Sequence, residues 1–283
     1  MSKDLPDIQC SEPNVPIPIM QVGVENVEVP FKLELRSGGF CQLHAKVSIR
    51  TDLDKDTKGI SMSRLLLTLK PYLDLPLKQT LIAQILEAVR KNVGSFGSYM
   101  KFEFSMPIMR NSIVSDHRFP IYYKCKFEGQ WWGEWHPFKF FHGVTIQYAS
   151  YCPCSAELCG HLSENDSQGF PHNQRSFADI LIEGKEGQYI WLEDIIDAVE
   201  SKILTLPYPI IKRVDEQEIA RVAAENPMFV EDAIRLISQS LNDMDDVKDW
   251  IVKCSHEESI HTSEAIAINY RGVINGFDGR RYL

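Results

Sequence analysis

Alternating apolar and polar side chains predict two pairs of β-strands in the first half of the chain. The ranges 27–35 and 41–49 flank Ser37-Gly38-Gly39, and a glycine-rich turn between two such runs indicates a hairpin. The ranges 101–106 and 121–127 show the same period. Within 41–49, every other side chain lies on one face of a half-buried strand: Cys41, Leu43, Ala45, Val47 and Ile49.

Between the two pairs of strands, the apolar spacing becomes that of α-helices. Helices are predicted over 63–72 and 77–93, and Gly94 is a suitable stop for the second one. The apolar residues of that second helix fall on one face: Leu81, Ile82, Ile85, Leu86 and Val89. The first half therefore has the order strand, strand, helix, helix, strand, strand.

The second half repeats this order without repeating the sequence. A long loop carries the cysteines, and 213–216 is expected to lie in an irregular connection between two helices. One helix is predicted over 191–204, and a second begins with the cap and first-turn proline Asn226-Pro227 and runs to Leu241. Strands are predicted over 137–148, 176–182, 249–254 and 264–270.

Two copies of one order of elements predict an α+β fold made of two tandem ββααββ modules, with antiparallel sheets and helices on one face. We divide the chain into an extended N-terminal arm (1–25), a first module (26–130) and a second module (131–283) that carries the candidate site. Because open sheets have edges that must be covered, we expect a homo-oligomer.

Composition and charge narrow the class of partner. The 283 residues are 44% hydrophobic and 24% charged, as in soluble globular proteins. The net charge of -9 argues against a nucleic-acid surface, although one local group of Lys and Arg is enough for a triphosphate. No apolar run is long enough to span a membrane, and scattered cysteines suggest reduced thiols, so we expect a cytoplasmic protein.

The most unusual stretch is Cys152-Pro153-Cys154-Ser155, followed by Pro171-His172-Asn173-Gln174-Arg175-Ser176. One hypothesis is a structural zinc clip, whose ligands would be Cys152, Cys154, Cys159 and His161. The other is an open catalytic metal site with a second, unligated cysteine beside it. The residues alone leave both hypotheses open.

Three acidic residues elsewhere are candidates for the same site. Glu216 either belongs to a solvated charged run or completes a Cys, His, Glu metal shell. Glu231 is either a solvated early-helix carboxylate or an acceptor for two adjacent N–H donors, as in guanine. Glu258 and His261 form either a polar turn or an acid/base pair.

A cationic segment precedes the first predicted helix. Lys58-Gly59-Ile60-Ser61-Met62-Ser63-Arg64 combines two cations, hydroxyl groups and a glycine at a helix N-terminus. Backbone N–H groups and cations at such a position bind phosphates, although the spacing is not that of a P-loop. The segment is therefore a candidate phosphate cradle.

Taken together, these motifs resemble the prokaryotic type IB GTP cyclohydrolases. The resemblance extends from Gln21-Val22-Gly23 through the Lys58, Cys152 and His172 segments to Glu258-Ser259-Ile260-His261, in the right order. The family implies a tunnelling fold (T-fold), a homotetramer with active sites at subunit interfaces, and conversion of GTP to dihydroneopterin triphosphate and formate. This chain departs from the family pattern at Ile60-Ser61 and at Ser263.

Residue roles follow from the resemblance position by position. It implies one divalent metal per subunit (Zn, Mn or Fe(II)), held by Cys152, His172 and Glu216. Catalytic roles fall to Cys154, His261 and Glu258. The expected substrate-binding residues are Glu231, Lys58, Ser63, Arg64, Gln174 and Arg175.

Two alternatives to this function remain open at the level of sequence. The first is a non-catalytic purine- or pterin-binding module in which the cysteines hold structural zinc. The second is the related archaeal-type activity, which leaves a cyclic phosphate on the product. Loss of fold on mutation of Cys154 would favour the first, and the mass of the product would identify the second.

Overall fold

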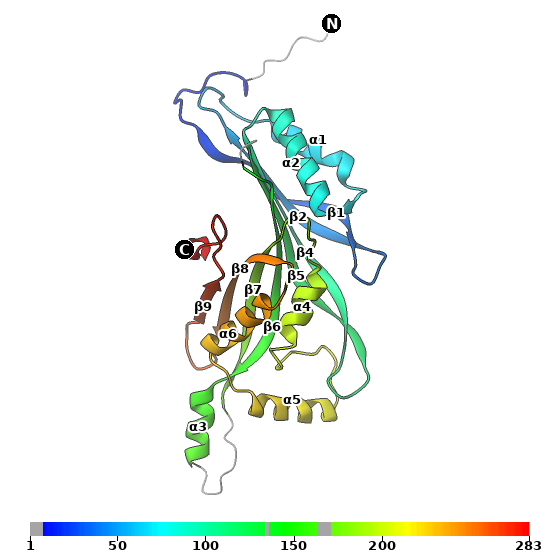
Figure 1. Cartoon of the computed structure of the whole chain (residues 1–283), viewed down its shortest axis with the longest axis vertical. Coiled ribbons are helices and arrows are strands. Elements are labelled where there is room, and N and C mark those ends of the chain that lie inside the picture. The colour runs from blue at the N-terminus through cyan, green and yellow to red at the C-terminus, as the bar shows by residue number, and fades with distance from the viewer. Residues whose placement is uncertain (1–7, 134–135, 163–170, 283) are drawn as a thin grey trace. The chain divides into compact units, whose positions relative to one another are not determined.

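The computed structural model describes residues 8–133, 136–162 and 171–282. Its strands form one nine-stranded sheet with the order β3-β1-β2-β4-β5-β6-β7-β8-β9 (Figure 1). The strands are β1 (Ile19–Glu34), β2 (Phe40–Leu53), β3 (Pro76–Leu77), β4 (Gly97–Asn111), β5 (Arg118–Trp132), β6 (Lys139–Tyr151), β7 (Asn173–Gly184), β8 (Val247–Glu257) and β9 (Ala265–Tyr270). The helices are α1 (Met62–Leu69), α2 (Gln79–Val93), α3 (Pro153–Leu162), α4 (Leu192–Glu200), α5 (Arg213–Glu225) and α6 (Val230–Asn242), with short 3-10 turns at Lys70–Tyr72 and Gly279–Tyr282.

The fold predicted from the sequence, a tunnelling fold of two tandem ββααββ modules with antiparallel sheets, is wrong. The strands form a single sheet, and that sheet is mixed because β3 pairs with β1 in parallel, Lys32 opposite Pro76 and Leu33 opposite Leu77. The second half also contains α3 and α5, where a loop and an irregular connection were predicted. Alternation along a strand identifies its buried face but not its neighbours in the sheet, which is why the error arose.

The chain divides into two compact units. Unit 1 comprises Met1–Ser105 and Lys126–Phe141, and unit 2 comprises Met106–Cys125 and His142–Leu283. The predicted boundaries at 25 and 130 stay a prediction, although β1 already begins at Ile19, inside the predicted arm. In the part of the chain that is described, no helix is both long and apolar enough to cross a membrane.

Unit 1 packs α1 and α2 side by side against its strands (Figure 1). The predicted face of α2 is confirmed, because its five apolar residues are all buried, and Gly94 ends the helix with a left-handed φ of 69°. Four phenylalanines from neighbouring strands form a row, with ring centroids 5.0 to 5.4 Å apart: Phe31, Phe104, Phe127 and Phe140. Such tilted aromatic contacts add to the stability gained from burial.

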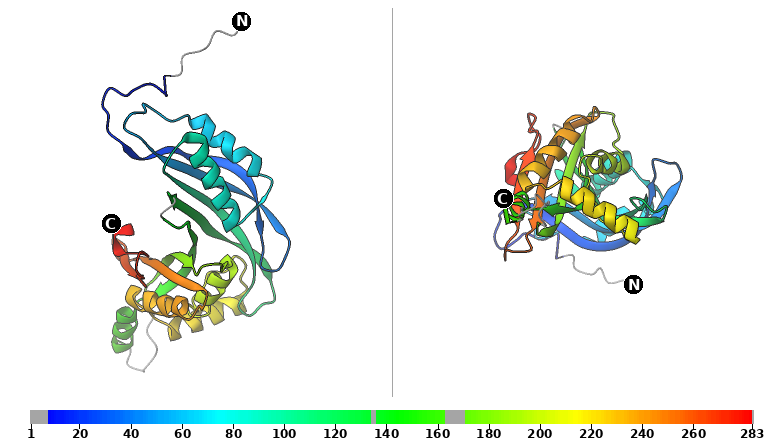
Figure 2. Two further views of the ribbon diagram at one scale, coloured as in Figure 1. Left: turned by 45° about the horizontal axis from the view of Figure 1, so that its top comes forward. Right: turned by 90° about the horizontal axis from the view of Figure 1, so that it is seen from below.

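In unit 2, α6 packs against β8 and β9 and beside α4 (Figure 2). The helix predicted over 191–204 is present as α4, and its Ile195, Ile196 and Val199 are fully buried. The predicted start of the last long helix is wrong: α6 begins at Val230, and Asn226 ends α5 instead. In contrast to these packed helices, α3 buries none of its side chains.

Candidate active site

Cys152 and His172 lie together where β6 ends and β7 begins. The backbone N–H of Cys152 donates to the carbonyl oxygen of His172 at 3.3 Å. Ser155, in the first turn of α3, donates its backbone N–H to the sulfur of Cys152 at 3.5 Å and accepts the N–H of His172 on its hydroxyl oxygen at 3.3 Å. The start of α3 therefore ties together the two residues that were predicted to share a metal.

Three side chains surround one nitrogen of the His172 ring. Nδ1 lies 3.1 Å from Oε1 of Gln174, 3.4 Å from the hydroxyl oxygen of Ser259 and 3.9 Å from Oε2 of Glu258. The amide nitrogen of Gln174 donates to Oε1 of Glu258 at 2.9 Å. Because all these contacts are at Nδ1, Nε2 is the ring atom placed to bind a ligand.

The register of β7 and β8 explains how residues so distant in sequence meet. Arg175 is opposite Glu257 and Ser176 is opposite His256, so Gln174 reaches Glu258 just beyond the last pair. Successive side chains of a strand point to opposite faces of a sheet. Gln174 is consequently buried while Arg175 is exposed, so the two predicted substrate-binding neighbours do not share a face.

Cys154 and His261 are exposed at the edges of this group. Cys154 is in the first turn of α3, two residues after Cys152. The backbone N–H of His261 donates to the carbonyl of Glu258 at 3.3 Å, which places both residues at the ends of one turn. The polar turn predicted for this segment is thus present, and the acid/base role stays a prediction.

Glu231 lies in the first turn of α6, and its side chain is exposed. Its charge affects the pKa of His256, a buried residue whose Nε2 lies 3.0 Å from the hydroxyl of Tyr148. Burial lowers the pKa of His256 to about 4, and the negative charge of Glu231 opposes that shift. The carboxylate is therefore close enough to influence the helix-covered face of β8.

Glu216 is exposed on α5, one residue after the buried Asp215. Asp215 holds the start of this helix, because its carboxylate accepts the N–H groups of Val114 at 2.9 Å and Lys212 at 2.7 Å. Ser115 adds two further donors, its backbone N–H at 2.7 Å and its hydroxyl at 2.5 Å. A rigid helix start therefore presents Glu216 to the surface.

The predicted metal ligands are only partly gathered in one chain. Cys152 and His172 are together, but within residues 8–133, 136–162 and 171–282 no three His, Cys, Asp or Glu side chains form a group able to hold a metal ion. Glu216 is consequently not assembled with the pair. The alternative zinc clip is not assembled among these residues either, because Cys154 and Cys159 lie along α3, which buries no side chain, and do not gather around one point.

The predicted phosphate cradle belongs to unit 1. The backbone N–H groups of Lys58 and Gly59 donate to the carbonyls of Ser11 at 3.0 Å and Gln9 at 3.1 Å. Two of the expected phosphate donors are thus already paired. Lys58, Ser63 and Arg64 are exposed, and Arg64 lines a cavity of about 230 Å³ that also contains Asp52 and Asp54.

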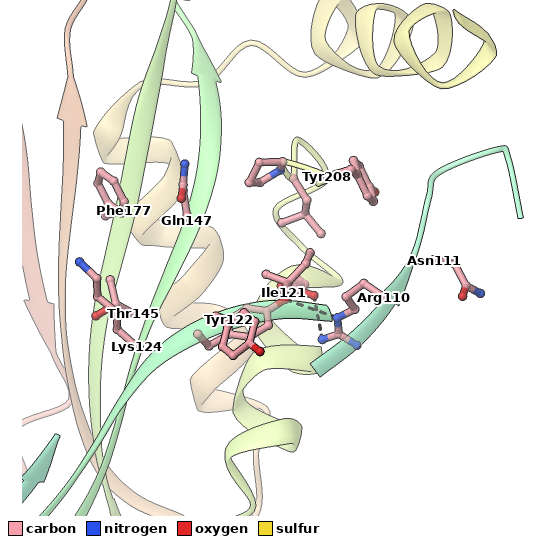
Figure 3. Close-up of a pocket in the computed structure, with 13 residues that line it drawn as sticks. Arg110, Asn111, Ile121, Tyr122, Lys124, Thr145, Gln147, Phe177 and Tyr208 are labelled. Atoms are coloured by element: carbon pink, nitrogen blue, oxygen red, sulfur yellow. Dashed lines mark hydrogen bonds and ion pairs between the residues drawn. The ribbon is translucent and has the colours of Figure 1, made fainter. Parts of the chain in front are cut away.

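A separate pocket of about 240 Å³ lies within unit 2, and none of the predicted site residues lines it (Figure 3). Arg110 extends over one side, where it pairs with Asp197 at 2.8 Å and Glu200 at 2.9 Å. Burial raises the pKa of Glu200, while hydrogen bonds from Tyr123 and Arg110 oppose the shift. Because neither Cys152 nor His172 nor the residues around them line this pocket, it is separate from that site.

Sequence reasoning missed Ser155, Ser259, Tyr148 and His256. Ser155 and Ser259 occur inside motifs that were singled out, but a sequence does not show which hydroxyl reaches which ring. His256 carried a usable signal. Alternation along β8 places Cys254 and His256, opposite Ala178 and Ser176 of β7, on the face on which Gln174 is buried.

Solved structures with a similar fold are urate oxidases. Uricase from Arthrobacter globiformis superposes with a TM-score of 0.53 and 6% identity, over 93% of this chain and 97% of that one. Urate oxidase from Bacillus sp. TB-90 gives a TM-score of 0.54 and 10% identity, over 89% of this chain and 99% of that one. At such low identity the likeness shows the fold alone.

Similarity in sequence shows the family. GTP cyclohydrolase FolE2 of Cereibacter sphaeroides (strain ATCC 17029 / ATH 2.4.9) is 32% identical over 273 residues, which cover 95% of this chain and 76% of that protein. The protein of the same name from Roseobacter denitrificans is 34% identical over 256 residues, or 90% and 69% of the two chains. The family model for type I GTP cyclohydrolase folE2 matches residues 5–267, so the chain belongs to that family.

Proposed function

We propose that this chain is a GTP cyclohydrolase that converts GTP to 7,8-dihydroneopterin triphosphate and formate in folate biosynthesis. The observation that carries the proposal is the family match over residues 5–267. The neighbouring Cys152 and His172 support it, because a thiol and an imidazole with an orienting partner suit a hydrolytic metal site.

A divalent metal, Zn, Mn or Fe(II), fits the donor chemistry of the pair. Cys152 and His172 would hold it, and when bound it would supply Lewis-acid activation of water. Glu216, exposed on α5, is the third proposed ligand and completes the set where subunits meet. We further propose a cytoplasmic homotetramer with its active sites at these interfaces.

The chain's own residues would then divide the work on GTP. Glu231 accepts hydrogen bonds from the guanine edge, since a carboxylate offers acceptors only. Lys58, Ser63 and Arg64 bind the triphosphate through their exposed side chains. Water adds at C8, the imidazole ring opens, and a second hydrolysis releases C8 as formate, with Cys154 and His261 moving protons.

The test is turnover of GTP by the purified chain with Mn, Zn or Fe(II), measured as formate and, after oxidation, as neopterin fluorescence. Protein stripped with a chelator is the control. The mass of the product separates dihydroneopterin triphosphate from a cyclic phosphate. Absence of turnover with every metal would overturn the proposal.

A further inference from the structure

The hydrogen bonds around Gln174 fix the orientation of its carboxamide. An ionised carboxylate has acceptors only, so the NH2 group of Gln174 must face Glu258, at 2.9 Å from Oε1. Its oxygen consequently faces His172, with Oε1 at 3.1 Å from Nδ1. A carbonyl oxygen accepts a hydrogen, so the neutral His172 ring carries its proton on Nδ1 and has its lone pair on Nε2.

Burial makes this arrangement more restrictive than a surface contact. The Gln174 residue is 6% exposed, and the side chains of His172 and Glu258 are each 16% exposed. Both polar groups of the Gln174 amide form hydrogen bonds within the chain, the oxygen with His172 and the nitrogen with Glu258. The role of a substrate contact, expected from the sequence, therefore suits Gln174 less well than an internal one.

We propose that Gln174 is a positioning residue that holds the His172 proton on Nδ1, and that Glu258 in turn holds the Gln174 amide. The His172 ring is thereby prepared in the form whose Nε2 binds a metal. The assignment of that nitrogen to a metal rests on the proposed function. The tautomer itself does not, because it follows from the hydrogen bonds of the chain.

The tautomer is measured in metal-free protein by long-range proton–nitrogen correlation NMR. The His172 signals are assigned by their loss in His172→Asn. In the unsubstituted protein His172 is expected as the Nδ1–H form. Gln174→Met removes the nearer of the two acceptors at Nδ1, the other being the Ser259 hydroxyl oxygen at 3.4 Å, so the population of the Nε2–H form should rise and the affinity for Zn or Mn should fall by about 10–100-fold. Gln239→Met, an exposed glutamine on α6, is the matched control and should change neither quantity.

Exchanging the two side chains separates positioning from general disruption of the fold. In the double variant Gln174→Glu with Glu258→Gln, a carboxylate accepts from Nδ1–H and an amide donates to that carboxylate. The Nδ1–H form and most of the metal affinity should return, because the acceptor at Nδ1 and the donor that holds it are both restored. Circular dichroism checks that every variant is folded.

The outcomes are decisive in both directions. An Nε2–H ring in the unsubstituted protein, an unchanged tautomer in Gln174→Met, or a double variant that behaves like Gln174→Met would each overturn the positioning role. If His172 shows the expected tautomer and responds as described, but no metal supports turnover of GTP, the proposed function fails while this inference stands.

Discussion

The Cys152 and His172 region of unit 2 and the 58–64 segment of unit 1 are both rich in polar groups, but they use those groups differently. Around His172, side chains from β7 and the turn after β8 bind one ring nitrogen and leave the other directed elsewhere. In the 58–64 segment, the backbone donors of Lys58 and Gly59 are already paired with Ser11 and Gln9. The first region is arranged for a ligand, whereas the second retains only its exposed side chains for one.

The difference shows which kind of polar motif can form a binding site in this fold. Sheet register brings Gln174 and Glu258 together across 84 positions and holds them at fixed spacing. A segment whose polar residues are adjacent in sequence has no such constraint, and its backbone N–H groups can form hydrogen bonds with another part of the chain. Substitutions in the two regions should therefore differ in effect, with the larger losses in the His172 region.

The largest effect is expected from Cys154→Ala. If Cys154 moves protons during the reaction, formate release should fall by about 10²–10⁴-fold while bound metal is retained, because Cys152 and His172 are unchanged. Turnover and metal content are measured on the same sample. Cys159→Ala, on the same helix, is the matched control and should keep both. Loss of metal and of fold in both variants would instead support the structural zinc clip.

A smaller effect is expected from Arg64→Gln in unit 1. If its exposed guanidinium binds the triphosphate, the KM for GTP should rise by about 10–100-fold, the range expected for a hydrogen bond to a charged group. kcat should change little, since phosphate contacts bind substrate and transition state alike. Lys91→Gln, an exposed cation on α2, is the control. Equal KM values for all three proteins would remove the 58–64 segment from the site.

Periodicity predicted most of the individual elements. The predicted face of α2 is buried at all five positions, and that of β2 at Leu43, Ala45, Val47 and Ile49, with Cys41 half-buried. The spacing of apolar residues shows which face of such an element is buried. It failed at α3, whose residues are all at least partly exposed, and at α5, which is mostly polar. A helix that buries little leaves little apolar pattern to detect.

The site was predictable in its residue types more than in its geometry. The family resemblance implied that Cys152 and His172 share a metal, and the structure places the two residues together. The contact between Gln174 and Glu258 depends on the register of β7 with β8, which the sequence does not specify. The covering of Lys58 and Gly59 by residues 9–11 depends on a long-range backbone pairing that has no side-chain signature.

Asp215→Asn tests whether the fold itself presents Glu216 at the surface. Burial raises the pKa of Asp215, but hydrogen bonds from Ser115, Lys212 and Val114 outweigh it and hold the pKa well below its ordinary value. The carboxylate therefore contributes stability above about pH 3.9, and this contribution is lost as the pH falls toward the folded-state value. The variant should unfold at lower denaturant concentration at pH 7, and the difference should narrow in acid. Ser115→Ala, which removes one donor, should show a smaller decrease; a difference that does not depend on pH would contradict this account.

The smallest effect concerns Glu231 and tests whether it belongs to the His172 region or is only a solvated carboxylate. His256, buried beside Tyr148, has its pKa lowered to about 4 from an ordinary value of 6.5. The unfolded chain therefore takes up a proton more readily, so the free energy of unfolding should fall as the pH drops from about 6.5 to about 4. Glu231→Gln removes a charge that opposes the shift, and so should lower the pKa of His256 further and extend this loss to lower pH. An NMR titration of His256 measures the change, with Asp232→Asn on the same helix turn as the control. Equal shifts in the two variants would mean that His256 senses the general charge of α6, and Glu231 would lose its place beside the site.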